Sequence, residues 1–258
     1  MPQPRPIVLV TGATAGIGRA IAQRFITEGY RVIATGRRRD RLEALQNDLG
    51  GAEYVYPASF DIRDASAVET FWEALPEQWQ PVEVLVNNAG LARGLDFFWE
   101  GKLSDWEEMI DTNLKGLLYI SKVVAAHMIQ QGGGFILNIG STAAKESYPK
   151  GNVYAATKRA VESLTEGMRH DLMGTGVRAA ALHPGLVNTE FGKVRFHGDE
   201  QKAAAAYRGM RPLTGEDVAE VAWYMASQPR HMTLSEVTLV PTAQVSSKTV
   251  HREEAEEE

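Results

Sequence analysis

The chain has 258 residues, of which 44% are hydrophobic and 24 are glycine, and this composition excludes fibrous and largely disordered chains. It predicts a single compact domain over residues 1–258, since a chain of this length buries about three quarters of its unfolded surface. The net charge of −6 and the absence of any apolar run of about 18 residues predict a cytoplasmic protein that binds neither nucleic acid nor membrane. The absence of cysteine excludes disulfides and thiolate metal sites and leaves the redox compartment open.

Short apolar runs alternate along the chain with longer segments of helical periodicity. The apolar runs predict strands at residues 7–10, 31–35, 54–56, 82–86, 135–139, 177–182 and 237–240. Several of these runs are continuously apolar, as expected for strands that helices cover on both faces. We therefore expect an α/β fold with a Rossmann-type, doubly wound parallel sheet of about seven strands.

The longer segments predict helices at residues 17–28, 39–49, 65–75, 104–130, 153–173 and 215–227. Ser104 and Thr214 are candidate N-caps, because a hydroxyl at that position accepts a hydrogen bond from the first turn. Residues 186–212 mix glycines, charges and a short alanine run, and they predict a mobile substrate lid. The acidic end of the chain, residues 252–258, predicts a flexible tail.

A glycine-rich turn, Thr11-Gly12-Ala13-Thr14-Ala15-Gly16-Ile17-Gly18, follows the first predicted strand and opens the next predicted helix. Glycines at these points let the backbone turn tightly and approach a pyrophosphate held at the helix N-terminus. A Walker A loop is excluded because no Gly-Lys-Ser/Thr sequence follows. The turn alone leaves a pure packing role open as an alternative.

The end of the second predicted strand carries Arg37, Arg38 and Arg39, with no carboxylate before Asp40. An acidic residue there would accept a hydrogen bond from the ribose 2′-hydroxyl of NAD, whereas arginine would pair with the 2′-phosphate of NADP. Arg37 and Arg38 therefore favour NADP(H) as the cofactor. The alternative is a charged helix start on the surface.

Ser141, Tyr154 and Lys158 form a second pattern, in which twelve residues separate serine from tyrosine and three separate tyrosine from lysine. If Tyr154 and Lys158 share a helix, their spacing places both on one face. A positive charge about 5 Å from a phenol is worth roughly 3 kcal/mol at an effective dielectric near 20. We therefore expect Lys158 to lower the pKa of Tyr154 until the phenol exchanges protons near neutral pH. A surface helix pair is the alternative for this pattern alone.

Together with Asn87-Asn88-Ala89-Gly90 after the fourth predicted strand, these motifs resemble the short-chain dehydrogenase/reductase family over nearly the whole chain. The resemblance implies that Tyr154 is the general acid/base, that Lys158 lowers its pKa and binds the nicotinamide ribose, and that Ser141 positions the substrate oxygen. It also implies that Asn113, within Asp111-Thr112-Asn113, supports a water that links the lysine to solvent.

The same resemblance implies a set of further cofactor contacts and an assembly. Asp61 and Ile62 match an adenine-contacting position, although Asp61 or Asp64 could instead cap a helix. Pro184-Gly185 opens a turn that lines the nicotinamide. The expected cofactor-binding residues are Thr11, Gly12, Thr14, Gly16, Ile17, Gly18, Arg37, Arg38, Asp61, Ile62, Asn88, Ala89, Gly90, Tyr154, Lys158, Pro184, Gly185, Val187 and Thr189. A homotetramer built on the two long helices is implied as well. The histidines lack the paired spacing of a metal site, so no metal is expected.

Four runs, at residues 10–16, 33–38, 139–143 and 151–154, resemble one branch of the family, the NADP-dependent 3-hydroxy acid dehydrogenases, also described as serine or L-allo-threonine dehydrogenases. Sulfoacetaldehyde reductases are close to this branch of the family. The resemblance implies interconversion of a small 3-hydroxy acid, or a hydroxy sulfonate, and its semialdehyde or ketone. Such a substrate needs a cation for its acid group. Arg195, Lys193 and Lys150 are the candidates, and Arg195 is preferred.

Two alternative functions remain open at this point. An acyl-thioester ketoreductase would share every catalytic residue, but the last predicted strand, Val237-Thr238-Leu239-Val240-Pro241-Thr242, lacks the Gly-Gly ending usual in such enzymes. A non-catalytic NADP-binding sensor or scaffold is the second alternative. It is disfavoured because Asn113, Ser141, Tyr154 and Lys158 are all present.

Overall fold

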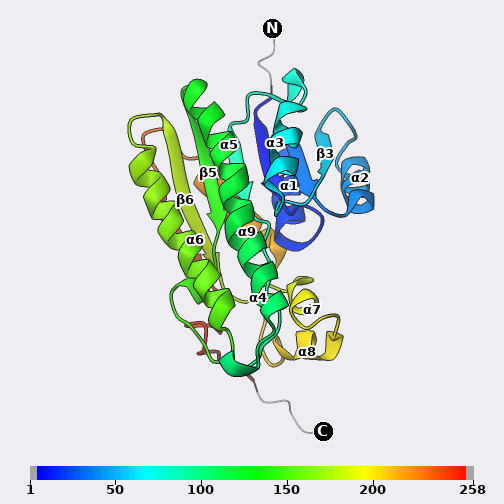
Figure 1. Cartoon of the computed structure of the whole chain (residues 1–258), viewed down its shortest axis with the longest axis vertical. Coiled ribbons are helices and arrows are strands. Elements are labelled where there is room, and N and C mark those ends of the chain that lie inside the picture. The colour runs from blue at the N-terminus through cyan, green and yellow to red at the C-terminus, as the bar shows by residue number, and fades with distance from the viewer. Residues whose placement is uncertain (1–4, 254–258) are drawn as a thin grey trace.

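The computed structural model describes residues 5–253 of the chain. Its strands form one parallel sheet in the order β3-β2-β1-β4-β5-β6-β7 (Figure 1). The strands are β1 (Ile7–Thr11), β2 (Arg31–Gly36), β3 (Val55–Ser59), β4 (Val84–Asn87), β5 (Gly134–Ile139), β6 (Val177–Pro184) and β7 (Glu236–Leu239). Strand order reverses between β1 and β4, which makes the sheet doubly wound. The predicted fold class is confirmed.

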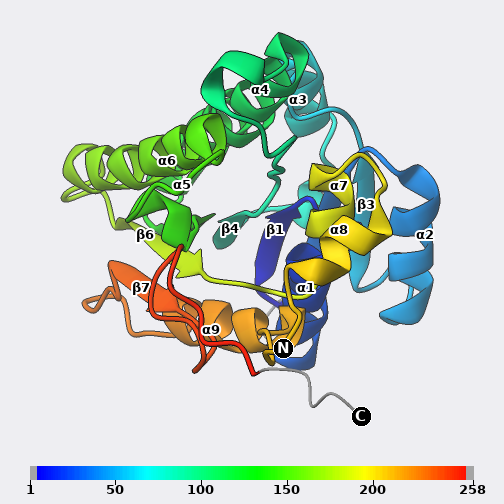
Figure 2. The same cartoon turned by 90° about the horizontal axis from the view of Figure 1, so that it is seen from below.

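The helices cover both faces of this sheet, and Figure 2 shows the two layers on either side of the strands. On one face lie α1 (Gly16–Thr27), α2 (Arg39–Asp48) and α9 (Gly215–Ala226); on the other lie α3 (Ala65–Glu73), α5 (Leu117–Gln130) and α6 (Asn152–Asp171). Because side chains alternate along a strand, Val8 and Val10 of β1 pack into the first core, whereas Ile7 and Leu9 pack into the second.

The long central helix differs from its prediction. It begins with α4 (Leu103–Ile110), continues as the π-helical segment η3 (Asp111–Gly116) and ends as α5. Ser104 was wrong as the N-cap, because the helix already begins at Leu103 and Lys102 takes the extended cap conformation. Thr214 is confirmed, since it forms a capping box with Asp217 at the start of α9.

The segment 186–212 contains two short helices, α7 (Phe191–Arg195) and α8 (Glu200–Ala205), which lie together beyond the carboxyl ends of the strands (Figure 1). Three short 3₁₀ turns, η1 (Glu77–Trp79), η2 (Phe98–Glu100) and η4 (Thr142–Ala144), complete the described elements.

The end of the described chain is bound to this segment. Arg252 donates hydrogen bonds to the carbonyls of Ala206 and Arg208, and the amide of Glu253 donates to Gly209 at 2.8 Å. Residues 252 and 253 are thus hydrogen-bonded to residues 206–209 through the Arg252 side chain and the Glu253 amide, and the flexibility expected of the tail stays a prediction. Residues 254–258 lie outside the described residues. Within the described range, no helix combines the length and apolar character needed to cross a membrane.

Candidate active site

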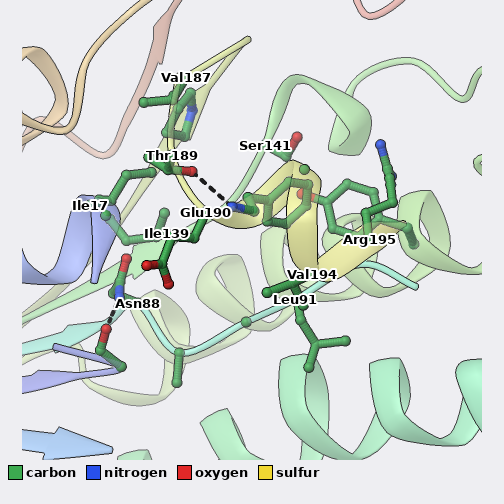
Figure 3. Close-up of a pocket in the computed structure, with 18 of the residues that line it drawn as sticks. Ile17, Asn88, Leu91, Ile139, Ser141, Val187, Thr189, Glu190, Val194 and Arg195 are labelled. Atoms are coloured by element: carbon green, nitrogen blue, oxygen red, sulfur yellow. Dashed lines mark hydrogen bonds between the residues drawn. The ribbon is translucent and has the colours of Figure 1, made fainter. Parts of the chain in front are cut away.

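A cavity of about 580 Å³ opens beyond the carboxyl ends of the central strands. Both its size and its place at the point where strand order reverses are typical of ligand sites in doubly wound sheets. The expected residues that line it are Gly12, Thr14, Gly16, Ile17, Arg37, Arg38, Asp61, Ile62, Asn88, Ala89, Gly90, Ser141, Tyr154, Lys158, Pro184, Gly185, Val187, Thr189 and Arg195. Figure 3 shows Ile17 and Asn88 at one side of this cavity and Ser141 and Arg195 at the other.

Two expected cofactor residues, Thr11 and Gly18, build the glycine-rich turn without lining the cavity. The Thr11 hydroxyl accepts hydrogen bonds from the amides of Asn88 and Ala89 at 3.0 and 2.9 Å, which joins β1 to the segment after β4. A Cβ atom at Gly18 would lie 2.4 Å from Asn88 Nδ2 and 2.5 Å from the carbonyl oxygen of Gly12. This close approach of Asn88 and Gly12 requires glycine at position 18. The absence of a side chain there keeps the start of α1 open to an anionic group.

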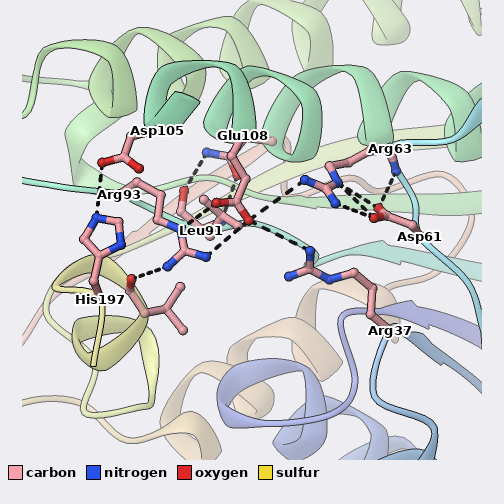
Figure 4. A network of polar contacts seen from close by, with 10 residues as sticks. Arg37, Asp61, Arg63, Leu91, Arg93, Asp105, Glu108 and His197 are labelled. Carbon is pink, nitrogen blue, oxygen red and sulfur yellow. Dashed lines mark hydrogen bonds and ion pairs between the residues drawn. The ribbon is translucent and has the colours of Figure 1, made fainter. Parts of the chain in front are cut away.

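Both expected arginines line the same end of the cavity. Arg38 donates from Nη2 to the hydroxyl of Thr14 at 2.6 Å and from Nη1 to Glu190 at 3.1 Å. Arg37 lies 3.9 Å from Glu108, within a network that also contains Arg63 (Figure 4). Two guanidinium groups beside the glycine turn fit a dinucleotide that carries a 2′-phosphate.

Asp61 and Ile62 lie at this end as well, after β3. Asp61 forms an ion pair with Arg63 at 2.6 Å (Figure 4), and the hydrogen bond from Arg63 is the main reason that the pKa of the Asp61 carboxyl is lowered. Of the two aspartates considered for helix capping, Asp64 caps α3 by accepting from the amides two and three residues ahead, and Asp61 does not. Asp61 therefore lies at the cavity wall with its carboxylate held by Arg63.

The catalytic candidates meet at the other end of the cavity. Ser141 follows β5, while Tyr154 and Lys158 lie on successive turns at the start of α6. Tyr154 is 8% exposed and Lys158 is 6% exposed, and the ammonium of Lys158 donates to the carbonyl of Ile139 at 2.9 Å. The structure thus brings the hydroxyl, the phenol and the ammonium to one wall of the cavity.

Burial controls the pKa values of this group. It raises the pKa of Tyr154 to about 12, with a further contribution from Tyr148, while Arg195 and Ser141 act in the opposite direction. Burial also lowers the pKa of Lys158 to about 8. The expected lowering of the Tyr154 pKa by Lys158 was therefore wrong in this structure, because desolvation of the phenol outweighs the nearby charges and the ammonium is directed to the Ile139 carbonyl.

Asn113 lies in the π-helical segment and does not line the cavity. Its Oδ1 accepts from the amide of Leu91 at 2.8 Å, and its Nδ2 donates to the carbonyl of Leu91 at 2.8 Å and to the hydroxyl of Thr157 at 3.1 Å. A π-helical turn inside an α-helix is frequent at functional sites. Asn113 therefore ties the segment after β4 to α6 beside Lys158, and its role toward a water stays a prediction.

Arg195 is the cation that reaches the catalytic end. Its guanidinium carbon lies 5.0 Å from the centre of the Tyr154 ring and 5.4 Å from that of Phe191, and its Nη2 donates to the hydroxyl of Tyr148. Its Nε is buried and has no hydrogen-bond partner among the described residues. A guanidinium with a free donor inside a cavity is suited to an anionic ligand group.

The other two candidate cations are directed elsewhere. Lys150 does not line the main cavity, and its exposed ammonium lies 4.4 Å from the centre of the Phe97 ring. Lys193 is exposed on α7 and pairs with Glu200. Neither lysine lines the main cavity, and Lys150 is withdrawn from the expected substrate contacts because its side chain extends outside that cavity.

Several residues that line the cavity were not expected from the sequence, among them Arg93, Tyr148, Glu190 and Gln244. Arg93 binds Glu108 through two nitrogens, at 2.6 and 3.2 Å, and donates to the carbonyl of Val194 at 2.8 Å (Figure 4). Its place three residues after Asn88-Ala89-Gly90 was a usable signal. Gln244 accepts from the amide of Leu186 at 2.8 Å, and nothing in its sequence neighbourhood marks it.

In the described part of the chain, acidic and histidine side chains do not gather into a metal site. Within residues 5–253, no three His, Asp or Glu side chains are placed so that they could hold a metal ion. His183 is fully buried behind the catalytic group, where its Nδ1 accepts from the amide of Ser141 at 3.3 Å. It supports the backbone that carries Ser141.

Comparisons with known proteins agree with this arrangement. A family model described as short chain dehydrogenase matches residues 6–200. The NADP-dependent 3-hydroxy acid dehydrogenase YdfG of Salmonella typhi is 48% identical over 95% of this chain and 99% of its own length. Sulfoacetaldehyde reductase 2 of Chromohalobacter salexigens is 44% identical over 93% of this chain and 96% of its own. A solved closed form of serine dehydrogenase complexed with NADP+ is 45% identical, covers 96% of this chain and 100% of its own, and has a TM-score of 0.91.

Proposed function

Because this chain belongs to the short-chain dehydrogenase family, we propose that it is an NADP-dependent oxidoreductase that interconverts a small 3-hydroxy acid, or a hydroxy sulfonate, and its semialdehyde or ketone. The observation that carries this proposal is that Arg195 lines the same cavity as Ser141, Tyr154 and Lys158. The names of the relatives support it, since a hydroxy acid, serine and sulfoacetaldehyde each join an oxidisable or reducible carbon to an acid group.

The side chains of the cavity have different roles in carbonyl reduction. In the reducing direction, the hydroxyl of Ser141 donates a hydrogen bond to the carbonyl oxygen, and the phenol of Tyr154 passes its proton to that oxygen. NADPH would supply the hydride that the carbonyl carbon accepts. The cation of Arg195 and the hydrogen bond with Ser141 favour the negative charge that develops on the phenol as its proton leaves, and Lys158 would bind the nicotinamide ribose. Arg195 also holds the acid group of the substrate.

The other end of the cavity fits the rest of the cofactor. Arg37 and Arg38 would pair with the 2′-phosphate, and the glycine-rich turn at the start of α1 would accept the pyrophosphate. The remaining expected cofactor residues line the wall between these two ends, with Thr11 and Gly18 holding the turn from behind.

A turnover screen tests this proposal. NADPH and NADH are each assayed with malonic semialdehyde, sulfoacetaldehyde and an acetoacetyl thioester, and their oxidised forms with 3-hydroxypropionate, serine and allo-threonine. We expect turnover with NADP(H) and the acid-bearing substrates. A clear preference for NADH would contradict the role of Arg37 and Arg38. Fastest turnover of the thioester would favour a ketoreductase, and NADPH binding without any turnover would favour a sensor.

The assembly and the location are part of the same proposal. We propose one domain per subunit and a homotetramer in the cytoplasm, built on the long helices α4–α5 and α6. Apolar side chains exposed along α4 and α5 support this assembly, namely Ile110, Leu118 and Ile129. Light scattering coupled to gel filtration tests the tetramer, and a monomer at micromolar concentration would contradict it.

A further inference from the structure

A carboxylate from the segment 186–212 reaches Arg38, one of the two expected cofactor arginines. Glu190 immediately precedes α7, and its carboxylate accepts hydrogen bonds from Arg41 Nη1 at 2.9 and 2.8 Å and from Arg38 Nη1 at 3.1 Å. Glu190 and Arg38 both line the cavity, whereas Arg41 does not. One carboxylate is therefore shared between an arginine inside the site and an arginine outside it.

Arg38 is held from two directions. Its Nε and Nη2 donate to the hydroxyl of Thr14 in the glycine-rich turn, and its Nη1 donates to Glu190. These contacts fix the guanidinium between the turn and the segment that carries α7. The pKa of Glu190 is lowered, first by its hydrogen bond with Arg41, so the carboxylate is charged at neutral pH.

The position of Glu190 is relevant to how such proteins select NAD or NADP. An acidic residue at the end of the second strand favours NAD, because it accepts a hydrogen bond from the ribose 2′-hydroxyl and repels a 2′-phosphate. The end of β2 carries no such residue, since Gly36 is followed by Arg37 and Arg38. Yet Glu190, 152 residues from Arg38 in sequence, brings a carboxylate to the same guanidinium through space.

We propose that Glu190 is a specificity-determining residue that limits the preference of this protein for NADP over NAD. Its carboxylate competes with the 2′-phosphate for Arg38 and provides an acceptor near a ribose 2′-hydroxyl. This inference rests on the proposed cofactor, and it adds a residue outside the second strand to cofactor recognition.

The expected size of the effect follows from exposure and charge. A 2′-phosphate brings close to two negative charges toward the carboxylate, and like charges at such separations repel each other. The side chain of Glu190 is 45% exposed, so water and salt screen most of that repulsion. We therefore expect that loss of the carboxylate charge tightens binding of a 2′-phosphate by roughly fivefold.

Binding of cofactor fragments tests the proposal without relying on turnover. Calorimetry measures the affinity of the full-length protein and of Glu190→Gln for 2′,5′-ADP, which carries the 2′-phosphate, and for 5′-AMP, which lacks it. We expect Glu190→Gln to bind 2′,5′-ADP roughly fivefold more tightly and 5′-AMP no more tightly. The Kd values for NADPH and NADH, from nicotinamide fluorescence, should diverge in the same direction.

Two further variants serve as controls. Glu200→Gln removes another carboxylate of the same segment, one that is 74% exposed and pairs with Lys193, and it should leave the fragment affinities unchanged. In Arg41→Gln, the carboxylate of Glu190 can pair only with Arg38. It should then compete more strongly with the 2′-phosphate for Arg38 and weaken 2′,5′-ADP binding. That weakening should shrink when Arg41→Gln is combined with Glu190→Gln, as a double-mutant cycle would detect. Thermal melting confirms that each variant is folded.

The outcomes separate this inference from the proposed cofactor. An unchanged ratio of the two fragment affinities in Glu190→Gln would overturn the inference, and so would weaker 2′,5′-ADP binding, which would mean that Glu190 orients Arg38 for the phosphate. If the unmodified protein does not prefer 2′,5′-ADP to 5′-AMP, the proposed cofactor is wrong and the inference fails with it.

Discussion

The guanidinium carbon of Arg195 on α7 lies 5.0 Å from the centre of the Tyr154 ring on α6. This proximity places the proposed proton donor next to the cation that would hold the acid group of the substrate. Arg195 also acts against the rise of the Tyr154 pKa that burial causes. A substrate whose carbonyl reaches Tyr154 while its acid group reaches Arg195 must be short, which is why a small acid fits this cavity better than a long acyl chain.

Arg195→Ala should raise the KM for an acidic substrate far more than the KM for a neutral aldehyde. A hydrogen bond to a charged group contributes about 1.5–3 kcal/mol, so we expect a loss of roughly tenfold to a hundredfold for sulfoacetaldehyde or malonic semialdehyde. Steady-state kinetics with one acidic and one neutral aldehyde of similar length would measure the difference.

Lys150→Ala is the matched control for this prediction. Its ammonium lies over Phe97 outside the cavity, so the KM for either aldehyde should stay close to that of the unmodified protein. Equal effects of Arg195→Ala on the acidic and the neutral aldehyde would show that Arg195 does not hold the acid group.

Tyr154→Phe should abolish turnover while the protein still binds NADPH. The change removes the hydroxyl that gives the proton and leaves the ring in its packing against Phe191. Loss of a general acid costs about 10²–10⁴-fold in rate. Stopped-flow absorbance would follow turnover, and nicotinamide fluorescence would follow binding. Residual turnover within tenfold of the unmodified protein would rule out the phenol as the proton donor.

Lys158→Met should stabilise the folded protein near neutral pH while it abolishes activity. Burial lowers the pKa of Lys158 from 10.5 to about 8, so its ammonium destabilises the fold by about 3 kcal/mol below pH 8, where folded and unfolded chains are both protonated. Loss of the hydrogen bond to Ile139 offsets about 1 kcal/mol of this gain. Urea unfolding at pH 7 should therefore give a gain of about 2 kcal/mol.

The pH dependence of that gain is the sharper test. Between pH 8 and 10.5 the unfolded chain binds the Lys158 proton and the folded chain does not, so the stability of the unmodified protein rises with pH in this window. The advantage of Lys158→Met should shrink accordingly as the pH rises toward 10. An advantage that is constant over this range would show that the ammonium is not desolvated as the structure indicates.

Sequence reasoning located the fold and most of the site, because its signals are local. The glycine-rich turn, Ser141 and the Tyr154–Lys158 spacing each depend on residues that one strand end or one helix turn brings together. Glu190 was not identified from the sequence, and Arg195 was only the preferred one of three candidate cations. The reason is that only the path of the segment 186–212 decides which of its side chains enters the cavity. The pKa of Tyr154 was misjudged for a related reason. Spacing reveals a neighbouring charge, but the cost of burial depends on every element that packs around the phenol.

Asn113→Ala should destabilise the protein by about 2–4 kcal/mol, because it leaves the buried amide and carbonyl of Leu91 without partners. Thr157→Val removes the hydrogen bond at 3.1 Å from Asn113 to Thr157 and the one at 2.7 Å from the Thr157 hydroxyl to the Tyr154 carbonyl, and should cost about 1–2 kcal/mol. Urea unfolding of both variants would give these values. Since Leu91 follows the Asn88-Ala89-Gly90 wall of the cavity, Asn113→Ala should also weaken NADPH binding more than Thr157→Val does. Equal losses of stability in the two variants would mean that the Leu91 contacts of Asn113 do not hold this wall in place.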